Sequence, residues 1–348
     1  MAGQDGKIRI GVNGYGVIGK RVADAVARQD DMKIVGIADI ETDWRIKTAL
    51  QKGFKLFASV DERADVMRKA GFEISGVLDD LLREVNVVVD CTPKRIGAKN
   101  AERYRKLGVK FIVQGGEKHE VTGHSFVAEA SYLGAVGRDS TRVVSCNTTS
   151  VVRTLTALKR AGILRRARGT LMRRATDPWE SHKGGIMNTL VPEDEIPSHQ
   201  GPDAQTVDPE LDVVTIAVKV PETLAHLHTW SVQLARKASK EDVIEAFRSS
   251  SRVALIRMSD GLTALNTIKE LMADMGRPRD DLYEVALWED LLTVRSDEAF
   301  YAYMVDNQAI VIPETIDAIR ALTGRTREAD ISMAKTNDAL GIGTLFVQ

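Results

Sequence analysis

The sequence predicts an α/β protein of two domains, the first with a parallel sheet covered by helices and the second an α+β domain with a mostly antiparallel sheet. The length of 348 residues exceeds what one ordinary core accommodates. In the first half, short apolar strands alternate with amphipathic helices, which is typical of parallel strands joined by helical crossovers. From about Ala167, longer strand-like segments follow one another with few helices between them. We therefore expect one domain over 1–145 and a second over 146–312, with C-terminal helices in 313–348 packing back on the first.

The composition excludes several classes of protein. Hydrophobic residues make up 43% and charged residues 28%, and no apolar run approaches the length of a membrane-spanning helix. The chain does not begin with the basic and apolar regions of a signal peptide. The formal net charge is -1, and no segment combines clustered Lys and Arg with stacking aromatics, so we expect neither a membrane nor a nucleic-acid partner. The two cysteines, Cys91 and Cys146, provide neither a disulfide framework nor metal-ligand spacing, which favours a cytoplasmic location.

The second half contains five strand-like segments, one clear helix and one long loop. The helix in SKEDVIEAFRSS begins with Ser239 as N-cap and Asp242 at the third helical position, a variant of the capping box. Residues 176–210 are rich in Pro and Gly and weakly periodic, and a loop this long inside a domain is usually functional or mobile. Near the end, Pro313 stands in the first turn of a helical segment.

The segment GVNGYGVIG predicts a dinucleotide-binding site. Gly14, Gly16 and Gly19 are spaced as G-x-G-x-x-G between a predicted strand and an amphipathic helix. Such glycines permit a tight turn, a close approach to a pyrophosphate and close helix packing, and the helix N-terminus attracts the anion. Asp39 ends the second strand where an acid binds the ribose hydroxyls, so we expect a Rossmann domain that favours NAD. The alternative is that the glycines serve turns alone. Two basic residues could still accommodate the extra phosphate of NADP, namely Arg45 and Lys47.

Cys146 stands at the end of a predicted strand, directly before a helix whose first turn is Asn147, Thr148 and Thr149. The helix N-terminus favours the thiolate and lowers the pKa of the thiol, and its backbone N–H groups could hold an oxyanion. Such a cysteine could attack an aldehyde to give a hemithioacetal, lose hydride to give a thioester, and pass the acyl group to an acceptor. The alternative is a small buried side chain without reactivity, which is how we interpret Cys91.

Oxidation of the hemithioacetal requires a group that takes its proton, and histidine is the usual choice near neutral pH. The segment LAHLHTW offers His226 and His228, two residues apart and so on one face of a strand. By its position alone, either histidine could equally be a core residue. His119 and His124 are five apart and do not share a helix face, so no metal site is expected.

Six segments together resemble the archaeal-type (type II) phosphorylating glyceraldehyde-3-phosphate dehydrogenases: NGYGVIGKRVADAV, QGGEKHE, VVSCNTTS, RRATDP, SHQGPD and IVIPETIDAIRAL. They follow the family's order from about Ile8 to Asn337. The resemblance implies a Rossmann domain, a catalytic domain with a mobile substrate loop, and a homotetramer. It also implies reversible oxidation of glyceraldehyde 3-phosphate with NAD(P) and inorganic phosphate to 1,3-bisphosphoglycerate, a step of glycolysis and gluconeogenesis, through a cysteine hemithioacetal and thioester.

The matching motifs also imply roles for single residues. Cys146 is similar to the family's nucleophile, and its spacing favours His226 over His228 as the base. The residues expected at the substrate are Ser145, Asn147, Thr148, Arg173, His199 and Gln200, of which Gln200 replaces the second of two histidines usual in the family. The residues expected at the cofactor are Gly14, Gly16, Val17, Ile18, Gly19, Asp39, Gly116, Arg174 and Asn307, the last standing where many members have Gln. Arg173 and Arg174 suit phosphate oxygens, although consecutive strand residues point to opposite faces.

Two other functions explain fewer of these residues. One is another Rossmann dehydrogenase with an attacking cysteine, such as a semialdehyde or acyl-phosphate reductase, which substrates with and without a phosphate group would distinguish. The other is a non-catalytic nucleotide-binding redox sensor whose thiol reports oxidation. The sensor gives the histidine and arginine pairs no role, and His226→Asn would then leave thiol reactivity in place.

Overall fold

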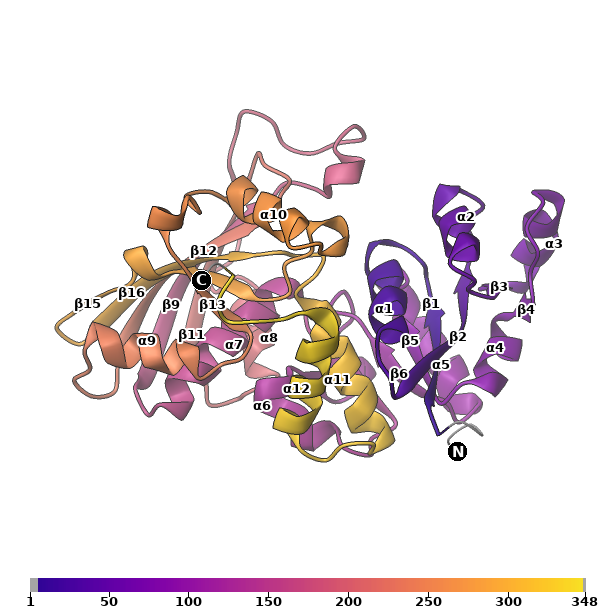
Figure 1. Ribbon diagram of the computed structural model, residues 1–348, viewed down its shortest axis with the longest axis horizontal. Helices are drawn as coiled ribbons and strands as arrows, with labels where there is room; N and C mark the ends of the chain where they lie inside the picture. The colour runs from indigo at the N-terminus through magenta and orange to yellow at the C-terminus, as the bar shows by residue number, and fades with distance from the viewer. Residues whose placement is uncertain (1–5, 347–348) are drawn as a thin grey trace. The chain divides into compact units, whose positions relative to one another are not determined.

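The computed structural model describes residues 6–346, which form two compact units (Figure 1). The first unit comprises the chain up to Val144 together with Ile312–Leu340, and the second comprises Ser145–Val311 and the residues from Gly341. Each unit buries a hydrophobic core of its own. Among the described helices, none has the length and apolar character needed to cross a membrane.

The first unit is built on an eight-stranded sheet in the order β4-β3-β2-β1-β5-β6-β8-β7. All pairings among these strands are parallel, as predicted. Its central strands are runs of Val and Ile buried on both faces, which requires helices on both sides of the sheet. The strands are β1 (Ile8–Asn13), β2 (Met32–Asp39), β3 (Leu56–Ala58), β4 (Gly76–Val77), β5 (Val87–Asp90), β6 (Lys110–Val113), β7 (Ser125–Phe126) and β8 (Ser140–Val143).

The helices of the first unit come from both ends of the chain. They are α1 (Val17–Ala27), α2 (Trp44–Gln51), α3 (Asp61–Lys69), α4 (Leu78–Glu84), α5 (Ile96–Lys106), α6 (Ala128–Ala135), α11 (Val311–Thr323) and α12 (Ala329–Leu340), with the short 3₁₀ helix η1 (His119–Val121). Hydrogen bonds attach α11 to α6 and to the turn that follows α6. The Ala128 backbone N–H donates to Glu314 at 2.6 Å, and Gly137 N–H donates to the Ala321 carbonyl at 2.9 Å.

The second unit has a mixed sheet in the order β10-β11-β9-β12-β16-β14-β13, with β15 paired to β16. Most of its pairings are antiparallel, as predicted, and the parallel ones are β9 with β11 and β13 with β14. The strands are β9 (Leu164–Arg174), β10 (Val191–Pro192), β11 (Val213–Val220), β12 (His226–Leu234), β13 (Val253–Ile256), β14 (Val285–Trp288), β15 (Thr293–Arg295) and β16 (Glu298–Val305).

The helices of the second unit are α7 (Cys146–Arg160), α8 (Gln200–Gln205), α9 (Lys240–Arg248) and α10 (Leu265–Asp274), with 3₁₀ helices η2 (Pro178–Glu180), η3 (Met258–Asp260), η4 (Pro278–Asp280) and η5 (Glu289–Leu291). The predicted capping box of α9 is confirmed. Asp242 N–H donates to Ser239 Oγ at 3.1 Å, and Ser239 N–H donates to Asp242 Oδ2 at 2.7 Å. The sequence analysis did not predict α10, which begins at Leu265 without a hydroxyl or carboxylate N-cap.

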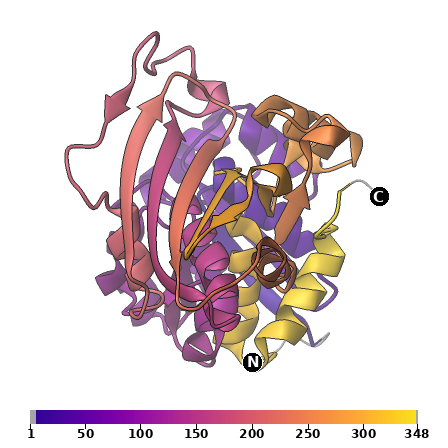
Figure 2. The same cartoon turned by 90° about the vertical axis from the view of Figure 1, so that its left-hand side faces the viewer.

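Alternation along β12 decides which side chains reach the interior. His226, His228 and Trp230 belong to its buried face, and the residues between them are half-buried. α7 and α8 contact β9, β11 and β16, so the buried face of the sheet is the one these helices cover. Figure 2 looks onto the other side, where the long strands β11, β9 and β12 have no helix in front of them.

The last described residues return to the second unit. Arg277 donates from Nη2 to the Gly341 carbonyl at 2.7 Å, and Gly343 N–H donates to Glu284 Oε1 at 3.0 Å. Phe346 packs against the core of this unit. The chain therefore crosses between the units more than once, after Val144, before Ile312 and after Leu340.

Candidate active site

Cys146 is the first residue of α7 rather than the last residue of a strand. β8 ends at Val143, and Ser145 is the N-cap of the helix, with its side chain accepting a hydrogen bond from Thr148 N–H at 3.3 Å. The sequence interpretation extended the strand too far because Val144 continues its apolar pattern. The thiol lies at the positive end of a helix of 15 residues, as the expected chemistry requires.

Thr148 is fully buried, and its hydroxyl serves the helix start. Its Oγ1 donates to Asp203 Oδ2 at 2.7 Å and lies 2.9 Å from Ser145 Oγ. These contacts connect α7 to α8, and they occupy the hydroxyl groups of two residues that the sequence assigned to the substrate.

His226 faces the thiol. Its Nε2 lies 3.6 Å from Cys146 Sγ, and its Nδ1 accepts a hydrogen bond from the Arg174 backbone N–H at 3.0 Å. A neutral imidazole that accepts at Nδ1 carries its proton on Nε2. The ring therefore presents an N–H group to the sulfur. A base at this position would need a free lone pair on Nε2. Because the Arg174 N–H binds the lone pair of the ring at Nδ1, Nε2 carries the proton and cannot accept another.

The electrostatics of the pair differ from the expectation of a lowered thiol pKa. Burial raises the pKa of Cys146 to about 11, while Arg174, Arg173 and the hydrogen bond from Asn147 N–H act in the opposite direction. Burial also holds the pKa of His226 well below its usual value, and the neighbouring His228 and arginines lower it further. Because desolvation outweighs the effect of the helix N-terminus on the pKa of the thiol, the site holds a thiol beside a neutral imidazole.

Arg173 and Arg174, at the end of β9, both act to lower the pKa of the Cys146 thiol. Strand alternation alone would have predicted that one of the two side chains points away from the thiol. Each is held by an acid from the long loop that follows. Arg173 Nη1 pairs with Glu193, and Arg174 Nη2 pairs with Asp177. Within the described residues, the buried Nε of Arg173 has no hydrogen-bond partner, so this guanidinium retains a donor for a ligand.

His199 and Gln200 follow Glu193 on the same loop. Nδ1 of His199, which is exposed, lies 3.4 Å from Glu193 Oε2, so one carboxylate contacts both Arg173 and His199. Gln200 is fully buried, and in the described structure neither its Oε1 nor its Nε2 has a partner. An unsatisfied buried amide is unfavourable, which is consistent with a polar group joining it when a ligand is bound.

The glycine loop of the first unit has the geometry that its spacing predicts. Gly14 adopts a positive φ of 91°, and a side chain on Gly19 would meet the Gly14 carbonyl at 1.8 Å. A side chain on Gly16, by contrast, would meet nothing within 4 Å. Gly16 is the N-cap of α1 and offers it no side-chain hydrogen bond, and the first turn contains no acid. This open helix N-terminus fits the pyrophosphate of a dinucleotide.

Asp39 ends β2 and holds the glycine loop by its carboxylate. Oδ2 accepts from Tyr15 N–H at 2.6 Å, and Oδ1 accepts from Ile40 and Glu41 N–H groups at 2.7 and 2.9 Å. Carboxylate oxygens have further lone pairs, so a ribose hydroxyl can still bind there. The guanidinium of Arg45 is paired with Asp43 at 2.5 Å, which reduces its availability for an additional phosphate.

The remaining predicted cofactor residues lie on both units. Val17 and Ile18 are the first residues of α1, and Gly116 is an exposed residue of the turn after β6. In the second unit, Asn307 follows β16, and its Oδ1 has no partner among the described residues. An amide with a free acceptor is able to bind a carboxamide, as the sequence analysis expected.

Comparison with known proteins supports the same assignment. Residues 145–276 match the family model "Glyceraldehyde 3-phosphate dehydrogenase, C-terminal domain", and residues 8–120 match "Dihydrodipicolinate reductase, N-terminus". Glyceraldehyde-3-phosphate dehydrogenases of Methanobrevibacter smithii and Methanothermus fervidus are 44% and 42% identical to 96% of this chain, covering 99% and 98% of their own lengths. That of Methanococcoides burtonii is 44% identical over 97% of the chain and 99% of its own length. The chain belongs to the glyceraldehyde-3-phosphate dehydrogenase family. It is an oxidoreductase with a Rossmann-type domain for NAD or NADP, as predicted.

Within this dehydrogenase, the sequence analysis missed several residues that contact the predicted ones. They are Asp177, Glu193, Asp203 and Tyr303, and Gln308 donates in turn to Asp177 at 2.7 Å. The weakly periodic loop gave one indirect signal, because acids in a segment that also carries substrate motifs can pair with nearby arginines. Tyr303 gave none, because its proximity to His228 depends on the register of β12 against β16.

Proposed function

We propose that this chain catalyses the reversible oxidation and phosphorylation of D-glyceraldehyde 3-phosphate to 1,3-bisphosphoglycerate with NAD(P). The observation that carries the proposal is the 3.6 Å approach of His226 Nε2 to Cys146 Sγ at the start of α7, with Arg173 and Arg174 beside them. This arrangement combines a sulfur nucleophile, a hydrogen-bond donor and two cations for phosphate oxygens.

Cys146 forms and breaks the covalent bond. Its thiol first loses its proton to solvent, because Nε2 of His226 already carries a proton. The thiolate then attacks the aldehyde carbon, and the carbonyl oxygen becomes the alkoxide of a hemithioacetal. NAD(P), which the glycine loop with Gly14, Gly16 and Gly19 would hold, would supply the two-electron acceptor for the hydride of this carbon. The carbonyl re-forms as a thioester, and an oxygen of inorganic phosphate then displaces the sulfur as thiolate and yields the acyl phosphate. The aldehyde is oxidised by two electrons, and the phosphate releases its proton to solvent.

His226 acts as a donor throughout this sequence. Its Nε2–H group stabilises the thiolate before attack and the alkoxide after attack, where the developing charge is largest. The Arg174 backbone N–H keeps the ring in this tautomer by occupying Nδ1. The alkoxide has no proton to lose, so the departure of hydride needs no base. A hydrogen-bond donor at His226 is therefore sufficient where the sequence suggested a base.

Arg173, His199 and Gln200 form the proposed anion-binding part of the substrate site, whereas Ser145 and Asn147 flank Cys146 at the reacting end of the substrate. The unpartnered Nε of Arg173 and the unpartnered amide of Gln200 provide donors that the described chain does not use. Charged donors favour a phosphorylated aldehyde over an uncharged one. This preference separates the proposal from a semialdehyde reductase.

The first unit provides the proposed dinucleotide site. Gly14, Gly16 and Gly19 leave room for the pyrophosphate at α1, and Asp39 is placed to accept from the ribose hydroxyls and to repel a 2′-phosphate, so NAD is the favoured cofactor. Both cysteines are free, which fits a reducing compartment such as the cytoplasm.

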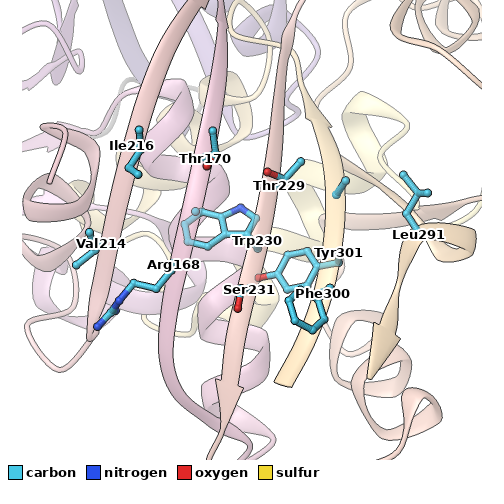
Figure 3. A pocket seen from close by; sticks show the side chains of 12 residues that line it. Arg168, Thr170, Val214, Ile216, Thr229, Trp230, Ser231, Leu291, Phe300 and Tyr301 are labelled. Atoms are coloured by element: carbon cyan, nitrogen blue, oxygen red, sulfur yellow. The ribbon is translucent and has the colours of Figure 1, made fainter. Parts of the chain in front are cut away.

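We also propose that the chain assembles as a homotetramer and that the uncovered face of the second sheet forms one of its interfaces. Figure 3 shows a groove on this face, where apolar side chains lie among small hydroxyl-bearing ones. The labelled lining residues include Val214, Ile216, Thr170, Thr229, Ser231 and Phe300. Ile216 is 42% exposed, and such apolar surface is typical of contacts between subunits.

The substrate assignment is tested by Arg173→Gln. We expect the KM for glyceraldehyde 3-phosphate to rise about tenfold or more, and the KM for unphosphorylated glyceraldehyde to stay within about twofold, because only the former loses a charged hydrogen bond. Arg165→Gln is the matched control, an exposed arginine on the same strand. An equal rise for both aldehydes would refute the proposed role of Arg173.

A further inference from the structure

His228 is a fully buried histidine that the proposed chemistry does not use. It follows His226 by two positions on β12, and the two rings stack with centroids 6.4 Å apart. A histidine needed only to fill the core could be replaced by an apolar side chain. Three polar contacts show that this ring is instead part of a hydrogen-bonded chain that ends beside Cys146.

The first contact determines the tautomer of His228. Its Nε2 lies 2.9 Å from Asn147 Oδ1, and an amide oxygen can only accept a hydrogen bond. The proton of the neutral ring is therefore on Nε2. Burial lowers the pKa of His228 to about 3, so the ring stays neutral over the working pH range of the enzyme.

The second and third contacts occupy the remaining nitrogen. Nδ1 of His228 must accept, and its hydroxyl neighbours are Tyr303 at 3.1 Å and Ser150 at 3.5 Å. Ser150 donates its own proton to the Asn147 carbonyl at 2.8 Å. The Tyr303 hydroxyl has two acceptors within reach, Ser150 Oγ at 3.4 Å and His228 Nδ1 at 3.1 Å, and we assign its proton to the nearer Nδ1. Tyr303 lies directly opposite His228 in the register of β12 and β16. All of these side chains are buried.

These hydrogen bonds use the side-chain oxygen of Asn147 but not its Nδ2 group. With Oδ1 held by His228, the amide plane is fixed, and no acceptor in the described part of the chain binds Nδ2. Asn147 is the second residue of α7, directly after Cys146, and its backbone N–H already bonds to the sulfur. Its side-chain amide is therefore a fixed donor next to the nucleophile.

We propose that Tyr303 and His228 are positioning residues that fix the Asn147 amide, so that its Nδ2 group donates to the oxygen of the tetrahedral adduct on Cys146. This rests on the proposed function, and it adds a second donor to the Nε2–H group of His226. An oxygen that becomes an alkoxide only after attack gains most from donors that need no reorganisation. The expected effect is therefore on kcat rather than on KM.

Two substitutions of His228 separate positioning from space filling. The amide nitrogen of Gln can take the place of Nε2, whereas that of Asn reaches only the position of Nδ1. We expect His228→Asn to lower kcat by about tenfold to a hundredfold with KM within about twofold, and His228→Gln to retain most of kcat. Cys146 alkylation and thermal unfolding should be similar in both variants. Equal losses of kcat in the two variants would overturn the proposal.

Tyr303→Phe tests the other end of the chain. Without the phenol, Nδ1 of His228 loses its donor, and kcat should fall several-fold while KM is unchanged. Tyr301→Phe is the matched control, because Tyr301 is buried two residues along β16 and its hydroxyl makes no bond to His228 in the described structure. Equal effects of the two substitutions would contradict the hydrogen-bonded chain from Tyr303 through His228 to Asn147.

A double-mutant cycle provides the decisive measurement. If His228 acts through Asn147, then His228→Asn should lower kcat in the parent enzyme but not in an Asn147→Ala background. Additive losses would overturn the inference and leave the proposed function in place. Failure of the proposed function has a different signature, namely a parent protein that makes no NADH from glyceraldehyde 3-phosphate and phosphate.

Discussion

At the scale of single residues, the proposed chemistry depends on the protonation of Cys146 and His226. The side chain of Cys146 is half-buried, and desolvation raises its pKa although it begins a helix and has two arginines nearby. The sequence showed the helix start and the arginines but not the burial, because burial depends on residues distant in the chain. The tautomer of His226 was equally invisible, since it is set by the backbone of Arg174.

The raised pKa predicts the pH dependence of thiol reactivity. In a Cys91→Ser background without ligands, the rate of alkylation of Cys146 by iodoacetamide should rise about tenfold per pH unit from roughly pH 7 to 9. Below its pKa a thiol is mostly protonated, so the thiolate fraction grows with pH until it approaches the value of about 11. A rate that levels off below roughly pH 8 would show a stable thiolate and contradict the account.

Asp39 predicts the preference for NAD over NADP. Asp39→Asn removes the charge that repels a 2′-phosphate, and the ratio of kcat/KM for NADP to that for NAD should rise about tenfold. Glu41→Gln removes an exposed acid nearby and serves as control. Steady-state kinetics with both cofactors measure this ratio. If Asp39→Asn leaves it unchanged, the discrimination lies elsewhere.

At the scale of elements, periodicity and turn residues predicted the parallel sheet, five strands of the second sheet and the capping box of α9, but not β10, β14 and β15. They failed where a signal was not local. α10 lacks a polar N-cap side chain, β8 ends before its apolar pattern does, and the register that brings Tyr303 to His228 depends on pairing between distant strands. Acids on the long loop reach the arginines of β9 only in the folded chain.

One buried arginine of α11 makes several of the hydrogen bonds that attach this helix to the first unit. Arg320 is fully buried, donates to Asp31 from Nε and Nη2 at 2.9 Å each, and donates to Gln29 and Thr336 at 2.7 and 2.6 Å. Although burial acts to raise the pKa of Asp31, the hydrogen bonds and charge of Arg320 hold it below its usual value.

Arg320→Met should lower the free energy of unfolding by about 3–5 kcal/mol, because it leaves a buried carboxylate unpaired. Arg83→Met removes an exposed pair with Asp80 on α4 and should lower it by less than about 1 kcal/mol. The contribution of Asp31 is present above its unfolded pKa of about 4 and is lost as pH falls through the lower folded value. Urea unfolding at several pH values should therefore show the loss shrinking in acid. A loss of the same size in both variants would contradict this role of Arg320.

At the scale of the whole molecule, the sequence predicted two domains and a dehydrogenase, and the comparisons establish the family. The uncovered face of the second sheet could not be recognised in advance, because alternation in β9, β11 and β12 shows that one face is apolar but not what covers the other.

The proposed interface predicts the effect of a buried charge. Ile216→Glu should lower the assembly mass measured by light scattering, because a carboxylate in an interface loses its hydration without gaining a partner. Leu133→Glu, at a position of α6 that is 75% exposed, should keep the parent mass. An unchanged mass for Ile216→Glu would place the contacts between subunits on another surface.

The central claim is that Cys146 carries a phosphate-dependent aldehyde oxidation. The most direct test is the rate of NADH formation from glyceraldehyde 3-phosphate with and without inorganic phosphate, in the parent protein and in Cys146→Ser. The account predicts turnover that requires phosphate and disappears in the serine variant. Equal rates in the two proteins would make Cys146 a structural residue, and turnover that needs the cysteine but not phosphate would indicate hydrolysis of the thioester; either result would contradict the proposed function.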